Sequence, residues 1–342
     1  MSVKRTLARL ATGKWAMPAV RRLCLGSGAT LFTLHRFAHP DGDPDGMSAA
    51  ALDDALGRFT AAGFEFVGLE QLIRCAREGQ KLPRNAIAFT VDDGYFDFAE
   101  VAMPVFARHH CPVTMFLVTG FIDGQQWMWW DKVTYLFDRT SCPTIAIEGF
   151  EASLDLADPS SRREAAGRFS TMLKRLPTSE KLARIDRLAD LLAVDLPRQP
   201  PSQYRPMSWD QIRACAAQGA SFGPHSVTHP ILSRSPERDA RSEIADSWQR
   251  VQAEVPGAIP VFAYPNGGVD DYGAREIDLL RDSGLLGAVT TRPGHLRNPV
   301  AGSGLFELPR WDLTSDPVRM SQVTSGLEAA KAAARQKLGM GA

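Results

Sequence analysis

The sequence lacks the features that would assign it to several protein classes at once. Its five cysteines are odd in number and none lie close together, which excludes a Cys-x-x-Cys zinc or redox motif and argues against a disulfide framework. It contains no continuous apolar run of about eighteen residues and no apolar signal-peptide core near its start. We therefore expect a globular protein of a reducing compartment, the bacterial cytoplasm.

Neither sign of charge dominates the composition. The 39 Lys and Arg residues balance 39 Asp and Glu residues, so we expect no nucleic-acid partner. The N-terminus is locally basic, since Lys4, Arg5, Arg9, Lys14, Arg21 and Arg22 all precede the first acid, Asp41. Two interpretations stay open: a solvated arm or surface helix, and peripheral contact with the anionic inner face of the membrane. The composition makes no prediction about oligomeric state.

Short apolar runs rich in β-forming residues alternate with longer amphipathic stretches. Strands are predicted at Ala29–Leu34, Phe64–Val67, Ala86–Val91, Val113–Val118, Ala220–Gly223, Pro260–Ala263, Leu285–Thr290 and Leu305–Leu308. Gly63, Gly219 and Gly284 are placed to end the helical stretches between them. Alternating strands and helices indicate parallel pairing. The pattern favours a distorted (β/α) barrel of about seven strands over a doubly wound open sheet.

The alternation stops between residues 121 and 206, where a tryptophan cluster, two helical stretches and a proline-rich link follow one another. We interpret this region as a helical insertion in one βα loop. The predicted organisation is a basic arm at residues 1–28, a barrel at 29–316 with the insertion at about 121–206, and a C-terminal helix at 317–342.

Chemically reactive side chains follow several of the predicted strands. They are His35, the pair Asp92-Asp93, the histidines His225 and His229, and the turn Tyr264-Pro265-Asn266. The carboxyl ends of parallel barrel strands lie on one face, so we expect these residues to meet there. Adjacent ionised carboxylates are costly at the end of a buried strand, and a cation would offset that cost. Two histidines and one aspartate would bind a divalent metal and leave a position for water.

At these residues the sequence resembles the polysaccharide deacetylases of carbohydrate esterase family 4, the NodB-homology domain. Thr90-Val91-Asp92-Asp93-Gly94 is similar to the first motif of that family, and His225-Ser226-Val227-Thr228-His229 to the second. The resemblance implies hydrolysis of N- or O-acetyl groups of an acetylated polysaccharide or oligosaccharide. It implies Asp92 as the general base and Asp93, His225 and His229 as ligands of a divalent ion, Zn²⁺ above others. Metal-bound water would attack the acetyl carbonyl, and a backbone N–H of the Tyr264-Pro265-Asn266 turn would hold the oxyanion.

The sequence departs from the family pattern at two positions. Ala263 stands where the third motif has an arginine that orients the base, and Arg310 is the candidate replacement. The last motif, which carries the general acid, has no clean match; His295 and His35 are the candidates. Trp129, with its neighbours Trp127 and Trp130, either stacks on a sugar ring or buries the insertion against the barrel.

Three alternative functions stay open from the sequence. The first is a related metal hydrolase of a small amide. The second is an Fe(II) oxygenase with two histidines and one carboxylate, although such sites usually belong to all-β folds. The third is a non-catalytic glycan-binding protein on the same fold, which the two departures from the family pattern suggest.

Overall fold

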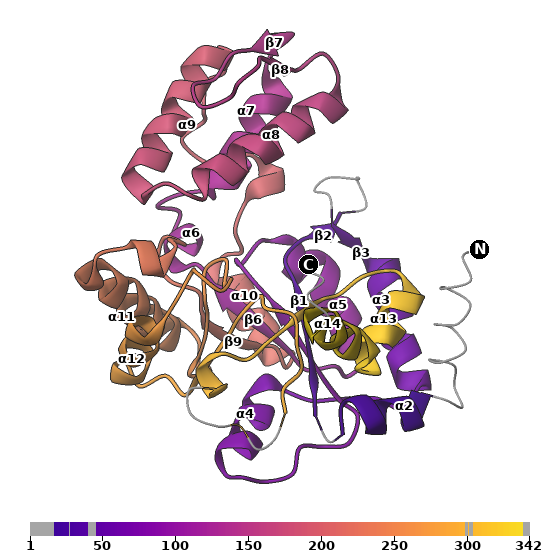
Figure 1. Ribbon diagram of the computed structural model, residues 1–342. Coiled ribbons are helices and arrows are strands. Elements are labelled where there is room, and N and C mark those ends of the chain that lie inside the picture. The colour runs from indigo at the N-terminus through magenta and orange to yellow at the C-terminus, as the bar shows by residue number, and fades with distance from the viewer. Residues whose placement is uncertain (1–16, 27, 40–45, 298–299, 301–303, 338–342) are drawn as a thin grey trace. The chain divides into compact units, whose positions relative to one another are not determined.

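The computed structural model describes residues 17–26, 28–39, 46–297, 300 and 304–337, and the chain divides into two compact units (Figure 1). Unit 1 contains the chain up to Ile122 and from Met207 onward, and unit 2 is Asp123–Pro206. In the part of the chain so described, no helix combines the length and apolar character needed to cross a membrane. Unit 2 begins two residues after the predicted start of the insertion.

Unit 1 is built on a six-stranded parallel sheet. The strand order is β12-β1-β5-β6-β9, with β4 beside β5. The strands are β1 (Thr30–Leu34), β4 (Glu65–Phe66), β5 (Ala86–Val91), β6 (Val113–Leu117), β9 (Ser221–Pro224) and β12 (Trp311–Asp312). β1 and β5 run in register, from Thr30 opposite Ile87 to Leu34 opposite Val91. The two strands therefore end together, one before His35 and the other before Asp92.

β10 (Val261–Ala263) and β11 (Gly287–Val289) form a second parallel pair, which is connected to this sheet by single hydrogen bonds and a bridge. The Ile259 N–H donates to the Phe222 carbonyl at 2.8 Å, and Val289 forms a single bridge with Leu308. The parallel α/β organisation is confirmed. Closure into a seven-stranded barrel is not, because the ladders among the described residues end at β12 and β9.

One predicted strand is wrong. Residues 304–306 form a 3-10 helix, η4 (Gly304–Phe306), and only Leu308 of the predicted run Leu305–Leu308 pairs with a neighbour. The following residues supply the last strand, β12, instead. The sequence pattern misled here because a three-residue apolar run is equally compatible with a tight helical turn.

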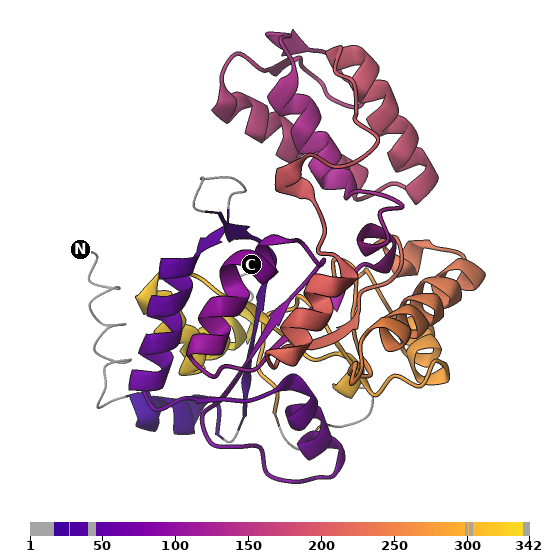
Figure 2. The ribbon, with the colours of Figure 1, turned by 180° about the vertical axis from the view of Figure 1, so that it is seen from behind.

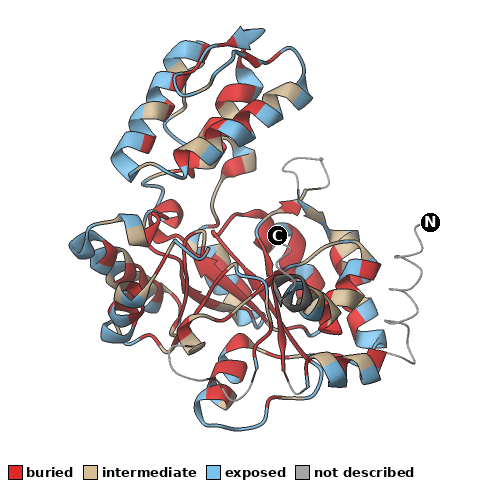
Figure 3. Cartoon of the chain, viewed as in Figure 1, coloured by how far each residue is buried: buried red, intermediate tan, exposed pale blue. Residues whose placement is uncertain are grey.

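The central strands are buried on both faces, as Figure 3 shows in red. Phe32 and Phe89 point into a cluster that the surrounding helices cover, whereas Leu31 and Ala88 point into a second cluster shared with β10 and β11. The covering helices are α3 (Ala49–Ala61), η1 (Phe98–Ala102), α5 (Met103–Arg108), α10 (Trp209–Ala217), α11 (Glu237–Glu254) and α13 (Pro317–Thr324). Near-continuous apolar strands are what two-sided burial requires.

The predicted glycines lie just after the ends of helices. Gly63, Gly219 and Gly284 have φ of 75°, 98° and 78°, the left-handed conformation of a cap. The same conformation at Gly326 (φ 78°) separates α13 from α14 (Leu327–Lys337), so the predicted single C-terminal helix is two helices. The remaining helices of unit 1 are α2 (Met17–Cys24), α4 (Leu69–Arg77), α6 (Thr119–Ile122) and α12 (Ala274–Asp282).

The predicted basic arm is partly packed. Arg21, in α2, is buried and donates to the carbonyls of Gly28, at 2.9 Å, and of Thr324. This part of the predicted solvated arm or surface helix is the helix α2, and the Arg21 guanidinium ties it to the end of α13. Residues 1–16 lie outside the described part of the chain.

Unit 2 has a core of its own. Helices α7 (Trp129–Arg139), α8 (Pro159–Leu173) and α9 (Thr178–Leu192) pack around a cluster that includes Phe137, Phe169 and Leu188, beside a short antiparallel pair, β7 (Thr144–Ile145) and β8 (Leu154–Asp155). The two helices predicted inside the insertion correspond to α8 and α9. Figure 2 shows the ribbon from behind.

Candidate metal and catalytic site

Two strands of the sheet, β5 and β9, which are separated by β6, deliver three polar side chains to one point. Asp93 follows β5, and His225 and His229 follow β9. Their ligand atoms all lie within 4.8 Å of one another, and all three residues are buried. The Nε2 atoms of His225 and His229 are 3.6 and 3.7 Å from Asp93 Oδ1. Ligand atoms arranged tetrahedrally about 2.0–2.2 Å from one zinc ion would be slightly closer to one another than these nitrogen–oxygen distances.

The backbone at this point is held in conformations that residues other than glycine rarely adopt. Asp93, Ser226 and His229 have φ of 78°, 65° and 59°. Such residues cost on the order of 1 kcal/mol or more each and persist where the surroundings impose them. The strain turns the three ligands toward a common point directly beyond the strand ends.

His225 is oriented as a metal ligand. Its Nδ1–H donates to the Ala263 carbonyl at 2.7 Å, which leaves Nε2 as the nitrogen facing Asp93. Burial lowers the pKa of His225 to about 4, against the opposing effects of Asp92 and of the hydrogen bond to Ala263. The neutral imidazole, the form that binds metals, therefore prevails at neutral pH.

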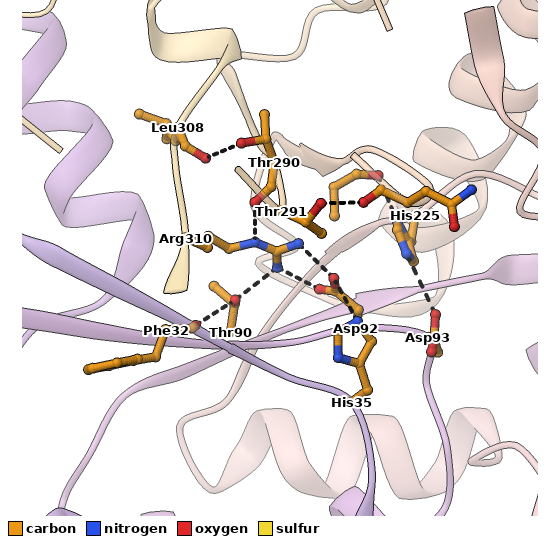
Figure 4. A network of polar contacts seen from close by, with 12 residues as sticks. Phe32, His35, Thr90, Asp92, Asp93, His225, Thr290, Thr291, Leu308 and Arg310 are labelled. Carbon is orange, nitrogen blue, oxygen red and sulfur yellow. Dashed lines mark hydrogen bonds and ion pairs between the residues drawn. The ribbon is translucent and has the colours of Figure 1, made fainter. Parts of the chain in front are cut away.

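Arg310 supplies the guanidinium that Ala263 cannot. Its Nη1 and Nη2 donate to the two carboxylate oxygens of Asp92, each at 2.7 Å, and the arginine is 1% exposed. Nε donates to the Thr290 carbonyl, and Nη1 also donates to Thr90 Oγ1, both at 2.9 Å. Figure 4 shows the guanidinium lying between Thr90, Thr290 and Asp92. A bidentate, buried pair of this kind fixes both partners.

Asp92 is ionised despite its burial. Burial alone would raise the pKa of this carboxyl, but the charge and hydrogen bonds of Arg310, assisted by His225 and His35, hold it well below its usual range. Asp92 thus presents a carboxylate beside the three ligands at any physiological pH. The two neighbouring aspartates differ in role because one is paired with Arg310 and the other faces the histidines.

His35 and His295, the two candidate acids, lie in different places. His35 follows β1, its Nε2 is 3.8 Å from Asp92 Oδ2, and its side chain is 45% exposed. His295 is buried with Nδ1 3.2 Å from Thr30 Oγ1, at the other end of β1. Thr30 is opposite Ile87, five residues before Asp92, or about 16 Å along a strand. The prediction of His295 as the acid is therefore wrong.

The turn after β10 offers one backbone donor. The Tyr264 N–H donates to the Val289 carbonyl and the Gly267 N–H to the Pro265 carbonyl, and proline has no N–H. Among the hydrogen bonds of the described residues none is made by the N–H of Asn266, whose φ is 58°, and this N–H is the candidate donor for an oxyanion. The Tyr264 side chain stacks on Tyr272, with ring centroids 4.1 Å apart, inside an apolar cluster, so its prediction as a substrate-binding side chain is wrong.

Trp129 is a core residue of unit 2. It is 8% exposed, and the ammonium of Lys181 lies 4.7 Å from the centre of its ring. The sugar-stacking interpretation fails for Trp129 because its ring is covered by its own unit, and the ring lies in the core of unit 2 itself.

Two contributors to the site escaped prediction. Thr90 accepts a hydrogen bond from Arg310 while donating to the Phe32 carbonyl at 2.8 Å, and Thr290 offers its backbone carbonyl to Arg310. Thr90 belongs to the quoted motif, but no local pattern marks it as an arginine partner. Thr290 contributes only backbone, for which sequence carries no signal.

Comparisons with known proteins give a consistent result. A family model described as polysaccharide deacetylase matches residues 164–284. Similar solved structures include IcaB from Ammonifex degensii (15% identity, TM-score 0.56, 88% of this chain and 98% of that one). Another is the Streptococcus pyogenes deacetylase PplD in complex with acetate (16%, 0.53, 84% and 92%). A third is a polysaccharide deacetylase from Bacillus cereus (13%, 0.53, 87% and 69%). At these identities the structures show a shared fold. No curated protein matches the chain by sequence.

Proposed function

We propose that the chain is a metal-dependent deacetylase of a polysaccharide or glycan precursor, because a polysaccharide deacetylase family model matches residues 164–284 and the similar solved structures include deacetylases. The observation that carries the proposal is the ligand group Asp93, His225 and His229 beside an ionised Asp92. The departure that suggested a non-catalytic protein, Ala263, is compensated by Arg310.

A divalent ion fits the three ligands. Two imidazoles and one carboxylate form a donor set that suits zinc, and it leaves a coordination position open. When bound, the ion supplies Lewis acidity toward water and toward the acetyl carbonyl. The histidine orientation described above, with Nδ1 of His225 bonded to backbone, is the usual arrangement around such an ion.

The chain's own residues supply the proton transfers. Asp92 accepts a proton from the attacking water, and Arg310 keeps the accepting oxygens in place and charged. The N–H of Asn266 donates to the oxygen that becomes negative as the acetyl carbon is attacked. Burial lowers the pKa of His35, so the imidazole first takes the proton that Asp92 has accepted and then delivers it to the departing nitrogen or oxygen.

The experiment is release of acetate from acetylated glycan oligomers by the wild-type chain and by Asp92→Asn, with Zn²⁺ content measured in parallel. We expect Asp92→Asn to lose at least about 100-fold in kcat, the scale of a lost general base, and to retain its zinc. Asp93→Ala should lose both. Full activity in Asp92→Asn, or no acetate release from any acetylated glycan by the zinc-loaded wild type, would contradict the proposal.

The acid role of His35 has a separate test. His35→Gln should lower kcat on an N-acetyl sugar by about 100-fold and leave hydrolysis of p-nitrophenyl acetate nearly unchanged, because nitrophenolate leaves without a proton. Equal losses on both substrates would instead assign His35 to binding or to the support of Asp92.

The particular glycan, the choice between N- and O-acetyl groups and the identity of the metal stay predictions. Cytoplasmic location, membrane contact through residues 1–28 and the absence of a nucleic-acid partner also stay predictions. A cytoplasmic deacetylase would act on a lipid-linked or nucleotide-linked precursor rather than on a finished extracellular polymer.

A further inference from the structure

The loop that carries both histidine ligands accepts hydrogen bonds from the neighbouring helix α6. The N–H groups of Thr119 and Gly120, in α6, donate to the carbonyls of Ser226 and Val227 at 3.1 and 2.9 Å. Within the loop, the His229 N–H donates to Ser226 Oγ at 3.0 Å. These contacts satisfy the carbonyls of the loop but leave the N–H groups of its middle residues to find partners elsewhere.

Glu243 provides those partners from α11. Its Oε2 accepts from the N–H groups of both Val227 and Thr228, each at 2.8 Å. Its Oε1 accepts from Thr228 Oγ1 at 2.5 Å. Three hydrogen bonds therefore reach one carboxylate from the two residues that lie midway between the ligands His225 and His229.

The chemistry of this contact is that of an anion in a backbone concavity. Consecutive N–H groups that follow a residue with positive φ, here Ser226 at 65°, converge on a single acceptor and attract a negative charge. Charge-assisted hydrogen bonds of this type are about twice as strong as neutral ones. The carboxylate thus opposes relaxation of the strained loop toward ordinary backbone angles, which would rotate His229 away from Asp93.

We propose that Glu243 is a positioning residue of the metal site, which holds the Val227-Thr228 turn so that His225 and His229 present both Nε2 atoms to the ion beside Asp93. The inference rests on the proposed metal site. Glu243 contacts neither the ligand side chains nor Asp92 among the described interactions, so its effect passes through the backbone of the loop.

The test measures Zn²⁺ affinity of the full chain at pH 7.5 by competition with a chromophoric chelator, together with thermal unfolding of the zinc-free protein. Glu243→Ala should raise the zinc Kd about 10-fold, the lower end of the range for outer-shell partners of metal ligands. Glu243→Gln keeps an oxygen for the two N–H groups and should remain within about 3-fold of wild type, since it loses only the charge assistance. Asp246→Ala removes an exposed acid from the same helix and should leave the Kd unchanged.

Two results would overturn the role of Glu243: a wild-type Kd in Glu243→Ala, or a Kd in Glu243→Gln as weak as in Glu243→Ala. If Glu243→Ala fails to fold, Thr228→Val removes one of the three hydrogen bonds and should weaken zinc binding by a smaller factor, whereas an unchanged Kd overturns the role. A wild-type chain that binds zinc no better than Asp93→Ala would instead overturn the metal site itself, which separates the two failures.

Discussion

At the scale of single residues, the site depends on one arginine, Arg310, which lies directly before β12. Ala263 has no side chain beyond Cβ, and its carbonyl is taken by His225. The Arg310 side chain reaches the same buried region and donates hydrogen bonds to Asp92 from both terminal nitrogens. Arg310 therefore places a guanidinium against Asp92 from a position far in the sequence from Ala263.

Removal of this guanidinium should change both activity and stability. Arg310 holds the pKa of Asp92 down, so Arg310→Lys, which cannot pair with both oxygens, should raise that pKa and move the acidic limb of the kcat/KM profile to higher pH. Arg310→Ala leaves a buried carboxylate without its partner and should cost about 3–5 kcal/mol at pH 7. A pH–rate profile and urea unfolding of both variants measure these effects.

The sign of the pH dependence follows from the direction of the shift. A carboxyl with a lowered folded pKa stabilises the fold above its unfolded pKa of about 4, and this stabilisation is lost as pH falls toward the folded value. The destabilisation caused by Arg310→Ala should therefore shrink below about pH 4. The control is Arg58→Ala, which breaks an exposed pair with Asp54 and should cost less than about 1 kcal/mol at any pH. Equal costs for the two variants would contradict the importance of the buried pair.

At the scale of elements, the ends of β5 and β9 decide where the ligands lie. β9 can approach β10 closely because Gly223 has no side chain: a Cβ built there would lie 2.5 Å from the Val261 carbonyl and 3.0 Å from the Phe116 ring. His225 follows two residues later and bonds the Ala263 carbonyl. The absence of a side chain at Gly223 therefore allows the ligand loop and the turn after β10 to lie close together.

Gly223→Ala should destabilise the chain by about 1–3 kcal/mol, the usual cost of overpacking, and should weaken zinc binding because β9 shifts away from β10. Urea unfolding and the zinc Kd check both effects. Gly167→Ala in α8 is the matched control: its Cβ meets no atom within 4 Å, and it should stabilise its helix by about 0.5–1 kcal/mol. A neutral result for Gly223→Ala would show that the strands separate at little cost.

At the scale of the whole molecule, the chain has separate cores. The apolar cluster of α7, α8 and α9 consists of residues from unit 2, whereas the clusters around the sheet are built from unit 1. Units with independent cores are expected to unfold with separate free energies rather than as one cooperative body. All the proposed ligands and proton-transfer residues belong to unit 1.

Leu173→Ala tests this independence. Leu173 is fully buried in the core of unit 2, and its truncation should destabilise that unit by about 2–5 kcal/mol. Hydrogen exchange followed by mass spectrometry should show faster exchange within residues 123–206 only. Leu56→Ala, in the core around the sheet, should have the converse effect. Faster exchange in both units after either substitution would indicate a single cooperative body.

The sequence by itself determined the parallel α/β organisation, the two helices of the insertion and the grouping of Asp93, His225 and His229. These follow from local periodicity and from one geometric rule, that parallel strands end on the same side. The rule needs no knowledge of distances, because each ligand follows its strand directly in the chain.

Only the tertiary structure decided which of the distant polar residues serve the site. Arg310 and His295 both lie between the helix that ends at Gly284 and the predicted C-terminal helix, yet one contacts Asp92 and the other lies at the far end of β1. In the sequence, Glu243 is an ordinary acidic residue of a predicted helix surface. Its role depends on the packing of α11 against the ligand loop. The physical reason is that these contacts depend on how nonadjacent elements pack, and hydrogen bonds to backbone N–H and C=O groups leave no trace in the identity of the partner residue.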